Sequence, residues 1–402
     1  MSLIVQKYGG TSVGTPELIC SVARKIQKDH LNGNSLVVVV SAMGQTTDEL
    51  LSLSQKVSLT PTQREMDMLL TAGERISMSL LSMALSDIGV SAISLTGSQT
   101  GIITDTSHRR ARIKRILGDR VREGLANGKV VIVAGFQGVS ESKDVTTLGR
   151  GGSDTTAVAL AAALHADRCE IYTDVNGFYS ADPRKIPNAK LWTNLSYDLS
   201  LEMAYLGAAV LHPRCLEIAK KYQIKVSIKN SFDKDQNQKG SNIMEFKKND
   251  QMEMFKLVGV TLDEEKCPIK VKLGRPTAAG SVLDCSTKVG LVVMAPFFSG
   301  NDLVFYVDQK ALNEWKKHLD FLLKENFIER YDCLEDWVPI SVVGECFSQD
   351  GRIFYTIIET LNESSIEPLF GASSALSFTC AVLKTHSDRA LDLLHKKLIE
   401  FS

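Results

Sequence analysis

A glycine-rich segment near the start of the chain, residues 7–14 (KYGGTSVG), has the residue types needed to bind phosphate. Glycines let backbone N–H groups approach phosphate oxygens closely, and the N-terminus of a following helix attracts anions. Lys7 adds a positive charge that can reach a transferring phosphoryl group. Because the lysine precedes the glycines, the segment is neither a P-loop nor a dinucleotide-binding fingerprint. We interpret it as a phosphate site, with a simple tight turn as the alternative.

A second glycine cluster, residues 148–156 (LGRGGSDTT), precedes an alanine-rich stretch with helical character. Arg150 offers a planar guanidinium that can hold a carboxylate through two hydrogen bonds. Ser153 and Asp154 lie beside it, at the end of a helix that attracts anions. The alternative is that one of these two residues only caps the helix.

A third segment, residues 173–184 (TDVNGFYSADPR), directly follows a predicted strand. It offers the carboxylate of Asp174, the aromatic ring of Tyr179 and the guanidinium of Arg184. Ligands of open α/β sheets bind beyond the carboxyl ends of strands, so these groups stand where a ligand is expected. A turn-rich loop without a ligand is the alternative.

The elements that position these segments follow an α/β pattern. Residues 3–7 alternate into the first glycine loop, residues 17–30 have helical spacing, and residues 36–40 are continuously apolar. A fully apolar strand after a helix is typical of a parallel sheet covered on both faces. The pattern predicts a three-layer α/β domain of about 230 residues, with a mainly parallel sheet. Further helices are predicted near 62–87, 109–127 and 155–165, and strands at 90–95, 130–136, 169–173 and 224–229.

The rest of the chain differs in character. We predict a catalytic domain over residues 1–232 and a polar linker over 233–256. Two small α+β units are predicted after it, over residues 257–330 and 331–402. Their strands are expected at 289–294, 303–307, 340–343 and 376–383, and their helices near 310–325, 351–362 and 387–400.

Composition limits the classes of function. The 46 Lys and Arg residues nearly balance the 47 Asp and Glu residues, so no broad attraction to nucleic acid or anionic lipid is expected. The eight cysteines are scattered without a Cys-x-x-Cys pair, which favours reduced thiols over disulfides or a zinc site. No signal peptide or long apolar run is evident. We therefore expect a cytoplasmic protein that contacts neither membrane nor nucleic acid.

Taken together, the three segments resemble, in order, the signatures of the aspartate kinases. Residues 41–47 (SAMGQTT), 71–75 (TAGER) and 211–213 (LHP) also resemble segments of that family, and the match covers residues 3 to about 231. The resemblance implies an amino acid kinase fold that transfers the γ-phosphoryl group of MgATP to the β-carboxylate of L-aspartate. The product would be 4-phospho-L-aspartate, and the reaction the first step of lysine, threonine and methionine biosynthesis.

The resemblance also implies a role for individual residues. Lys7 would stabilise charge on the transferring phosphoryl group, and Asp154 would orient either Lys7 or a metal-bound water. Because a carboxylate acceptor carries no proton at neutral pH, no general base is required. Mg²⁺ would be bound through the ATP phosphates and not by a dedicated set of protein ligands. The nucleotide is expected to contact Lys7, Gly9, Gly10, Thr173, Asp174, Tyr179 and Arg184, and the amino acid to contact Ser41, Thr47, Glu74, Arg150 and Ser153.

Three of these residues have simpler alternatives. Without its neighbours, Glu74 would be interpreted as an exposed helix carboxylate. Ser41 and Thr47 would most often be residues that start a helix. The chemistry of an amino acid favours the ligand roles, since its ammonium can pair with Glu74 and its carboxylate with Arg150.

The C-terminal part resembles the paired ACT domains of this family, which have βαββαβ topology and bind an effector amino acid. Residues 339–401 resemble the second domain, but residues 274–280 (GRPTAAG) replace the usual Asp-x-Pro-Gly turn of the first. Residues 281–289 are too short and polar to predict a full helix. We therefore expect a weakened effector pocket, for lysine or threonine, and a homo-oligomer formed through these domains. In the family one ACT unit can be inserted into the other, which allows residues 258–261 to pair with the late segment.

Other functions fit the sequence less well. A kinase of the same fold could act on acetylglutamate, glutamate, carbamate or UMP, but the first glycine segment combined with an ACT-like tail disfavours it. A catalytically dead amino-acid sensor is disfavoured by the intact Lys7, Arg150, Asp154 and Asp174. A fused homoserine dehydrogenase is not expected, since 402 residues leave no room for one.

Overall fold

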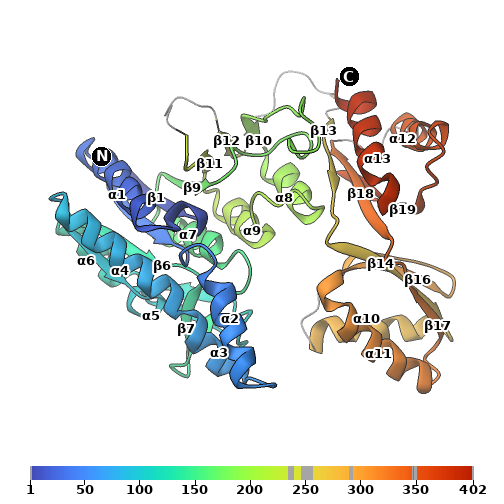
Figure 1. The fold of residues 1–402 in the computed structure, drawn as a ribbon, viewed down its shortest axis with the longest axis horizontal. Helices are drawn as coiled ribbons and strands as arrows, with labels where there is room; N and C mark the ends of the chain where they lie inside the picture. Colours follow the sequence, from blue (N-terminus) through green and yellow to red (C-terminus); the bar gives the residue numbers. More distant parts are fainter. Residues whose placement is uncertain are drawn as a thin grey trace. The chain divides into compact units, whose positions relative to one another are not determined.

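The computed structural model describes residues 2–233, 240–245, 257–288, 293–345, 347 and 351–400. The chain forms two compact units (Figure 1). The first comprises Met1–Phe178, Leu191–Leu201 and Ala209–Lys247, and the second comprises Tyr179–Lys190, Glu202–Ala208 and Lys248–Ser402. The chain therefore passes into the second unit twice before residue 248. Most of the predicted linker 233–256 lies outside the described residues.

The first unit is built on an eight-stranded sheet with the order β10-β12-β11-β9-β1-β2-β6-β3. Its strands pair in parallel except β12, which runs antiparallel to β11. The central strands are buried, and β2 and β6 are almost wholly apolar, as a sheet covered on both faces requires. The strands are β1 (Leu3–Tyr8), β2 (Ser35–Val40), β3 (Ala92–Leu95), β6 (Val130–Ala134), β9 (Arg168–Thr173), β10 (Asn194–Leu195), β11 (Val226–Asn230) and β12 (Ser241–Ile243).

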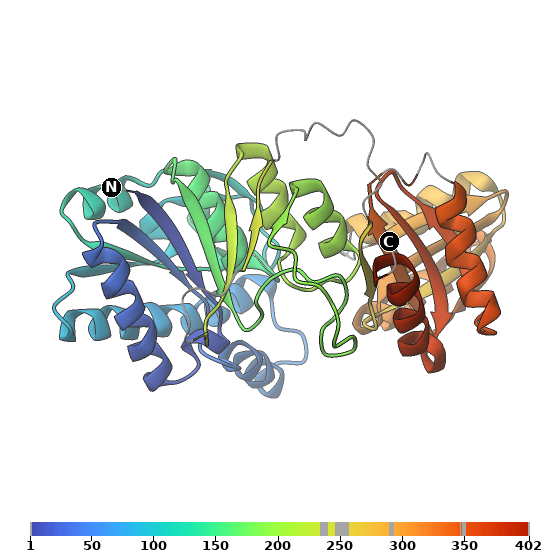
Figure 2. The same ribbon diagram turned by 90° about the horizontal axis from the view of Figure 1, so that it is seen from above.

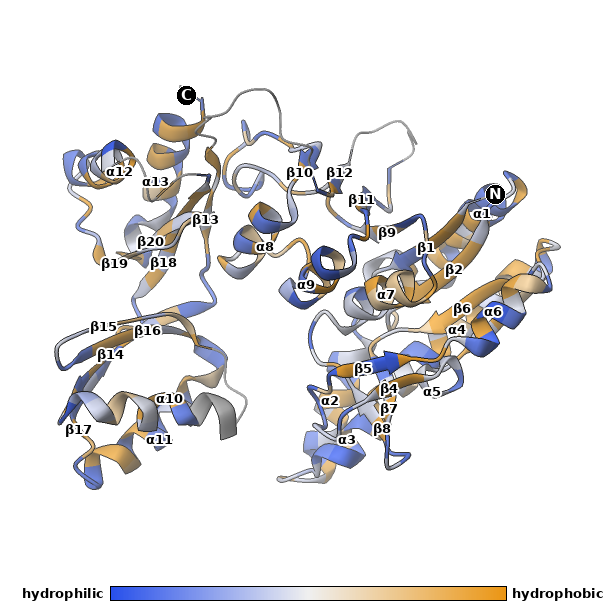
Figure 3. Cartoon of the chain, turned by 180° about the vertical axis from the view of Figure 1, so that it is seen from behind, coloured by the Kyte–Doolittle hydropathy of each residue, from blue (hydrophilic) through white to orange (hydrophobic). Residues whose placement is uncertain are grey.

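Helices cover both faces of this sheet (Figure 2). On one face, α1 and α4 pack on alternate apolar residues of β1, β2 and β6. Figure 3 shows β2 and β6 as mainly hydrophobic strands. On the other face, α7 contacts β1, β2 and β9, and α6 contacts β6. The three-layer architecture predicted from the sequence is thus present. The helices of this unit include α1 (Pro16–Leu31), α4 (Ala72–Asp87), α6 (Asp119–Ala126), α7 (Gly152–Ala163) and α9 (Pro213–Tyr222), while α8 (Tyr197–Tyr205) contributes residues to both units.

A smaller four-stranded sheet in the same unit has the order β5-β4-β7-β8. The single helix predicted over residues 109–127 is wrong in its first half, since β5 occupies that part and α6 begins only at Asp119. Pairing of β5 with β4 outweighs the helical preference of its charged residues, and Gly118, at a φ of 72°, separates the strand from the helix. The elements here are α2 (Thr46–Val57), α3 (Gln63–Leu70), α5 (Gly97–Thr100), β4 (Ile102–Thr104), β5 (Ile113–Ile116), β7 (Gln137–Ser140) and β8 (Val145–Thr147).

The early half of the second unit has βαββαβ topology, with the sheet order β15-β16-β14-β17. Its core surrounds the fully buried Phe305 and Trp315. The expectation that residues 281–289 form no full helix is wrong, because α10 covers most of them and buries Val282 against this core. The elements are β14 (Lys266–Leu273), α10 (Ala279–Lys288), β15 (Met294–Ser299), β16 (Asp302–Asp308), α11 (Leu312–Lys324) and β17 (Ile328–Cys333). Residues 289–292 of the predicted strand 289–294 lie outside the described residues.

The late half has the sheet order β13-β18-β20-β19. Strand β13 takes the place that β17 has in the early half, and Thr261 pairs with Ser341. The fourth strand of the late sheet therefore precedes the whole early half in the sequence, so one half is inserted into the other. The elements are β13 (Leu257–Leu262), β18 (Trp337–Gly344), α12 (Gly351–Glu363), β19 (Leu369–Ser373), β20 (Ser377–Leu383) and α13 (Lys384–His395), followed by a π-helical turn over Lys396–Glu400. Among the described residues, no helix is both long and apolar enough to cross a membrane.

Candidate active site

The candidate site lies at the carboxyl edge of the large sheet. Parallel pairing places Tyr8 beside both Val40 and Tyr172, so β1, β2 and β9 end at the same level. The first glycine loop, the 41–47 loop and the third segment begin immediately after these strand ends. Loops at such an edge converge, as ligand sites of open α/β sheets require.

The first glycine loop is fixed by backbone contacts to its two neighbours. The N–H of Gly9 donates to the carbonyl of Tyr172 at 3.1 Å, and the N–H of Gly44 donates to the carbonyl of Gly10 at 3.1 Å. A Cβ on Gly10 would lie 2.8 Å from the carbonyl oxygen of Ala42, so only glycine fits there. The loop continues into a short 3-10 helix, Thr11–Val13. This arrangement gives the phosphate-binding loop one defined conformation.

The two predicted catalytic residues form an ion pair. Lys7 Nζ lies 2.7 Å from Asp154 Oδ1, and the two side chains are only 10% and 13% exposed. Lys7 comes from the end of β1, and Asp154 from the first turn of α7. The pair therefore joins the first glycine loop to the second one. A positive charge in such a restricted setting can act on a phosphoryl group without being fully hydrated.

The second glycine loop leads into α7 through two left-handed residues. Gly149 and Gly151 have φ values of 78° and 65°, which favour glycine. A Cβ on Gly151 would overlap the side chain of His212. Ser153 is buried at the start of α7, and a Cβ on Gly135, just after β6, would lie 2.7 Å from its hydroxyl oxygen. Arg150 is exposed between the two glycines, so its side chain can reach a ligand at this edge.

Glu74 is the most unusual ionisable group of the site. It lies in the first turn of α4, 3% exposed, and its Oε1 accepts the N–H of Ala42 at 3.2 Å. Its Oε2 is also buried and has no hydrogen-bond partner among the described residues. Burial raises the pKa of Glu74 to about 7. Since native proteins rarely leave a buried carboxylate oxygen unpaired, this atom marks a place for a donor or a cation from a ligand.

The 41–47 loop connects Glu74 to the phosphate loop. The N–H of Ser41 donates to the carbonyl of Tyr8 at 3.2 Å, and Thr47 lies half-buried in the first turn of α2. A Cβ on Gly73 would lie 2.7 Å from the Cβ of Ala42, so α4 packs directly on this loop. The structure thus brings Lys7, Gly9, Gly10, Ser41, Thr47, Glu74, Ser153 and Asp154 to one edge of one unit.

The third segment is divided between the two units. Thr173 and Asp174 stay in the first unit at the end of β9, where the hydroxyl of Thr173 donates to Asp174 at 3.1 Å. Tyr179 and Arg184 belong to the second unit, where the guanidinium of Arg184 pairs with Asp182 at 2.7 Å. Nucleotide contacts by Tyr179 and Arg184 therefore stay predictions.

Sequence reasoning missed Arg214, which supports the second glycine loop. Its guanidinium donates to the carbonyl of Leu148 at 2.5 Å and to that of Ala111 at 2.9 Å. The LHP motif at residues 211–213 drew attention to this region, but a half-buried arginine at a helix start gives no sequence signal of its partners. In the described parts of the chain, no group of three or more His, Cys, Asp or Glu side chains could hold a metal ion.

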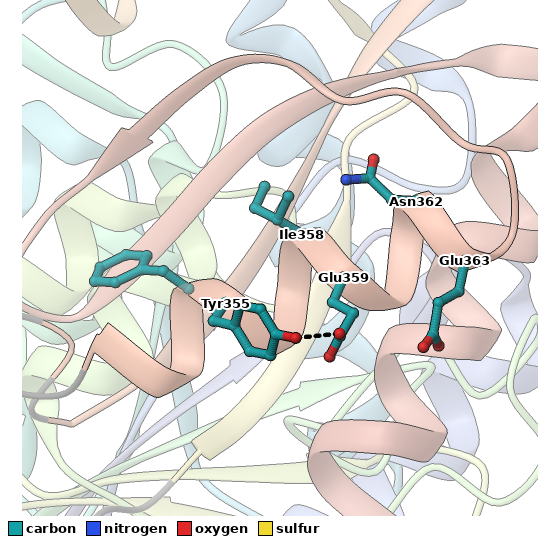
Figure 4. A pocket seen from close by; sticks show the side chains of 6 residues that line it. Tyr355, Ile358, Glu359, Asn362 and Glu363 are labelled. Carbon is teal, nitrogen blue, oxygen red and sulfur yellow. Dashed lines mark hydrogen bonds between the residues drawn. The ribbon is translucent and has the colours of Figure 1, made fainter.

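A separate open pocket of about 440 Å³ lies along α12 in the second unit (Figure 4). Its mostly apolar lining comes from this one helix, and the hydroxyl of Tyr355 donates to Glu359 within it. None of the residues predicted for catalysis or substrate binding lines this pocket. The lining residues are Phe354, Tyr355, Ile358, Glu359, Asn362 and Glu363.

Comparison with known proteins agrees with this architecture. Residues 2–230 match the model of the amino acid kinase family, so the fold and the two glycine loops define an amino acid kinase. An aspartokinase of Bacillus sp. (strain MGA3) is 40% identical over 407 residues, which cover 98% of this chain and 97% of that protein. An aspartokinase of Mycolicibacterium smegmatis is 40% identical over 98% of this chain and 96% of its own. The chain belongs to the aspartokinase family.

Solved structures support the same fold. The crystal structure of E. coli aspartokinase III in complex with aspartate and ADP has a TM-score of 0.84 at 21% identity, covering 98% of this chain and 99% of that chain. The aspartate kinase from Synechocystis has a TM-score of 0.56 at 37% identity, covering 98% of this chain and 69% of that chain. The predicted amino acid kinase fold followed by two small α+β units is therefore confirmed.

Proposed function

We propose that this chain transfers the γ-phosphoryl group of ATP to the β-carboxylate of L-aspartate, giving 4-phospho-L-aspartate and ADP. The observation that carries the proposal is the ion pair of Lys7 and Asp154 between two glycine loops, with a buried and incompletely bonded Glu74 near the first of them. Family membership supports it, since the relatives are aspartokinases and E. coli aspartokinase III binds aspartate and ADP.

The nucleotide occupies the side of the first glycine loop. The loop at Gly9 and Gly10 binds the β- and γ-phosphates, since residues without side chains let phosphate oxygens approach its backbone closely. Lys7 neutralises charge that develops on the transferring group. Asp154 orients Lys7 through their 2.7 Å contact. Thr173 and Asp174 border the nucleotide from the end of β9, whereas the predicted contacts of Tyr179 and Arg184, which belong to the second unit, stay predictions from the sequence.

Aspartate occupies the side of α4 and the second glycine loop. Its ammonium pairs with Glu74, and this ammonium supplies the hydrogen-bond partner that the buried Oε2 of Glu74 otherwise lacks. Arg150, which is exposed at the same edge, binds the α-carboxylate of aspartate through two hydrogen bonds. Ser41, Thr47 and Ser153 supply hydroxyl groups around it. This placement directs the β-carboxylate toward the phosphates.

The chemical step requires few protein groups. An oxygen of the ionised β-carboxylate attacks the γ-phosphorus, and the bond from that phosphorus to the bridging oxygen breaks, so ADP leaves with its electron pair. No proton is transferred, because the attacking carboxylate is already ionised. A Mg²⁺ ion carried by the ATP phosphates would neutralise phosphate charge when bound.

A hydroxylamine trapping assay tests the proposal. The purified chain is incubated with ATP, Mg²⁺ and aspartate, and the aspartyl phosphate is converted to its hydroxamate. ADP release is measured in parallel with glutamate, acetylglutamate, carbamate or UMP as acceptor. We expect turnover only when aspartate is the acceptor. Turnover with another acceptor instead would contradict the proposal, and binding of aspartate without turnover would favour a sensor.

We further propose that an amino acid, lysine or threonine, regulates the enzyme through the second unit, and that this unit joins two or more chains. Both halves of the unit have the sheet order expected of ACT-like domains. E. coli aspartokinase III has been crystallised with lysine and aspartate, and its fold is similar, with a TM-score of 0.74 at 22% identity over 99% of each chain. Light scattering with and without each amino acid tests the assembly, and a monomer under all conditions would contradict it.

A further inference from the structure

We propose that Asp67 is a positioning residue that fixes the loop carrying Arg150 and thereby sets the affinity for the amino-acid substrate. The proposal rests on the function proposed above. Asp67 lies in α3 and is fully buried, at 0% exposure. Nothing in the phosphoryl transfer requires this carboxylate, so its presence in the interior needs another explanation. Buried charges are costly unless several donors compensate them.

Three donors converge on the Asp67 carboxylate. The hydroxyl of Thr147 donates to Oδ1 at 2.5 Å, and the backbone N–H of Arg109 donates to Oδ1 at 3.0 Å and to Oδ2 at 3.1 Å. Nδ1 of His108 lies 2.7 Å from Oδ2 and donates to it in the tautomer that carries its proton on this nitrogen. The Thr147 hydroxyl and the Arg109 N–H both require an acceptor oxygen on this side chain, so the cluster depends on the chemistry as well as the shape of Asp67.

These donors lie on the two segments that support the second glycine loop. Thr147 ends β8, three residues before Arg150. Arg109 has a φ of 68°, a conformation that residues other than glycine rarely adopt unless their surroundings hold it. A Cβ on Gly149 would lie 2.9 Å from the carbonyl oxygen of Arg109, so the segment at 108–109 is packed against the loop. Asp67 thus fixes both the start of the loop and the surface beneath it.

A second clamp acts on the same pair of segments. The N–H of Ala111 donates to the carbonyl of Thr147 at 2.9 Å, which joins them directly. Arg214 binds the carbonyls of Leu148 and Ala111 from the side of α9. Arg214, on α9, and the buried Asp67, on α3, therefore restrain the same loop through different hydrogen bonds. The position from which Arg150 extends is determined by both.

The attachment of α3 itself does not require Asp67. Met66 and Leu70 of this helix are buried, and Arg64 pairs with Asp144, just before β8, at 2.8 Å. An apolar side chain at position 67 would attach the helix without the cost of burying a charge. The carboxylate instead fixes the orientation of the three groups that contact it, on His108, Arg109 and Thr147. This difference separates a positioning role from a purely structural one.

The variant Asp67→Asn tests the proposal in the full-length enzyme. Asparagine keeps the volume but replaces one acceptor oxygen with an NH₂ group, which then faces a donor. We expect the KM for aspartate to rise about tenfold or more, since small displacements of a binding group are costly. The KM for ATP and kcat should each change less than about threefold, because the described hydrogen bonds and ion pair of the first glycine loop involve other residues than the cluster.

Two further variants calibrate this result. Thr147→Val removes one donor at nearly constant volume, so it should raise the KM for aspartate by a smaller factor of about three. Asp144→Asn is the matched control, because it removes the charge from an exposed link between α3 and the segment before β8 without touching the cluster. It should leave both KM values unchanged. If Asp67→Asn does not fold, Thr147→Val still decides the question.

Hydrogen exchange supplies a readout that does not depend on activity. In Asp67→Asn, residues 106–112 and 147–151 should exchange faster while β1 and α7 keep their protection. An unchanged KM for aspartate in both cluster variants would overturn the proposal. So would an equal loss for aspartate and ATP, or exchange that increases throughout the unit. If the parent enzyme does not phosphorylate aspartate, the proposed function fails, whereas the exchange data still show whether Asp67 orders the loop.

Discussion

The proposed nucleotide side and the proposed amino-acid side of the site are built in different ways. The first glycine loop is fixed by backbone hydrogen bonds to the ends of β2 and β9, and it contributes backbone N–H groups and the charge of Lys7. The amino-acid side uses charged side chains, Glu74 and Arg150, supported by buried polar groups. The comparison indicates that changes on the nucleotide side should affect kcat, whereas changes on the amino-acid side should affect the KM for aspartate and its dependence on pH.

The largest effect is expected for Lys7→Ala. Loss of one preorganised positive contact to the transition state should lower kcat about a hundredfold or more. The fold should survive, because the variant removes only one partner of the ion pair with Asp154, near the carboxyl edge of the sheet. Steady-state kinetics with circular dichroism measures both.

Lys229→Ala is a matched control for this variant. Lys229 pairs with the buried Glu170 at 2.7 Å, and its strand register places it on the face of the sheet opposite Lys7. Its loss should lower the melting temperature but leave kcat within about twofold. A folded Lys7→Ala enzyme with near-normal kcat would show that Lys7 has no role in phosphoryl transfer. It would also contradict the expected difference between the nucleotide side and the amino-acid side.

The next effect concerns Arg150→Lys. Lysine keeps the charge but cannot reproduce the bidentate fork, so the KM for aspartate should rise about tenfold or more. The KM for ATP should change much less, as expected for the amino-acid side. Initial rates with each substrate varied in turn provide the measurement. Equal weakening of both substrates would mean that Arg150 acts on the phosphates or on the fold.

A pH effect should arise from Glu74, whose pKa burial raises to about 7. Below that pH the free enzyme carries a protonated Glu74, which cannot pair with the ammonium of aspartate. The KM for aspartate should therefore rise roughly five- to tenfold as the pH falls from 8 to 6, and Glu74→Gln should flatten this dependence. The KM for ATP over the same range is the internal control, and an equal rise there would contradict the assignment.

The same shift predicts a change in stability. A carboxyl with a pKa raised from its ordinary value of 4.5 binds its proton more tightly in the folded state. Its contribution to folding is therefore lost as the pH rises from about 4.5 through about 7. Relative to the parent, Glu74→Gln should be more stable at pH 8 and nearly equal at pH 5. Thermal unfolding at both pH values tests this, and equal differences at the two would show that Glu74 does not titrate in this window.

The sequence predicted the site best where one continuous motif stands at a strand end. Lys7 and Asp154 come from two such motifs, and parallel pairing of strands with a following helix brings them together. Asp67 and Arg214 could not be predicted, because their partners, such as Thr147 and Leu148, are distant in sequence and are selected by tertiary packing. Strand β5 was missed for a similar reason, since its pairing with β4 is not visible in its local composition.

The early half of the second unit shows the same limit. Residues 281–289 have few apolar residues, so their periodicity is too weak to predict a helix. In the structure Val282 is buried in a core with Trp315, and this packing stabilises α10 despite the weak periodicity of its sequence. The insertion of this half between β13 and β18 was allowed by the resemblance, but the pairing partner had to come from the structure.

The smallest expected effect is feedback regulation, and α10 changes the argument for it. Its presence gives the early half a complete βαββαβ topology, so only the altered turn at 274–280 still argues for a weak effector site. That turn begins with the N–H of Gly274 donating to the carbonyl of Phe327 at 3.0 Å and continues into a 3-10 helix, Pro276–Ala278.

We expect lysine, more than threonine, to raise the apparent KM for aspartate by about fivefold, the low end of typical coupling between sites. An effect on that KM without an effect on kcat would place the coupling on the amino-acid side. Titration of lysine, threonine and, as a control, alanine against the initial rate at subsaturating aspartate provides the measurement. Steep inhibition at micromolar lysine would show that the altered turn still forms a full effector site, and a fall in kcat alone would connect regulation to the nucleotide side instead.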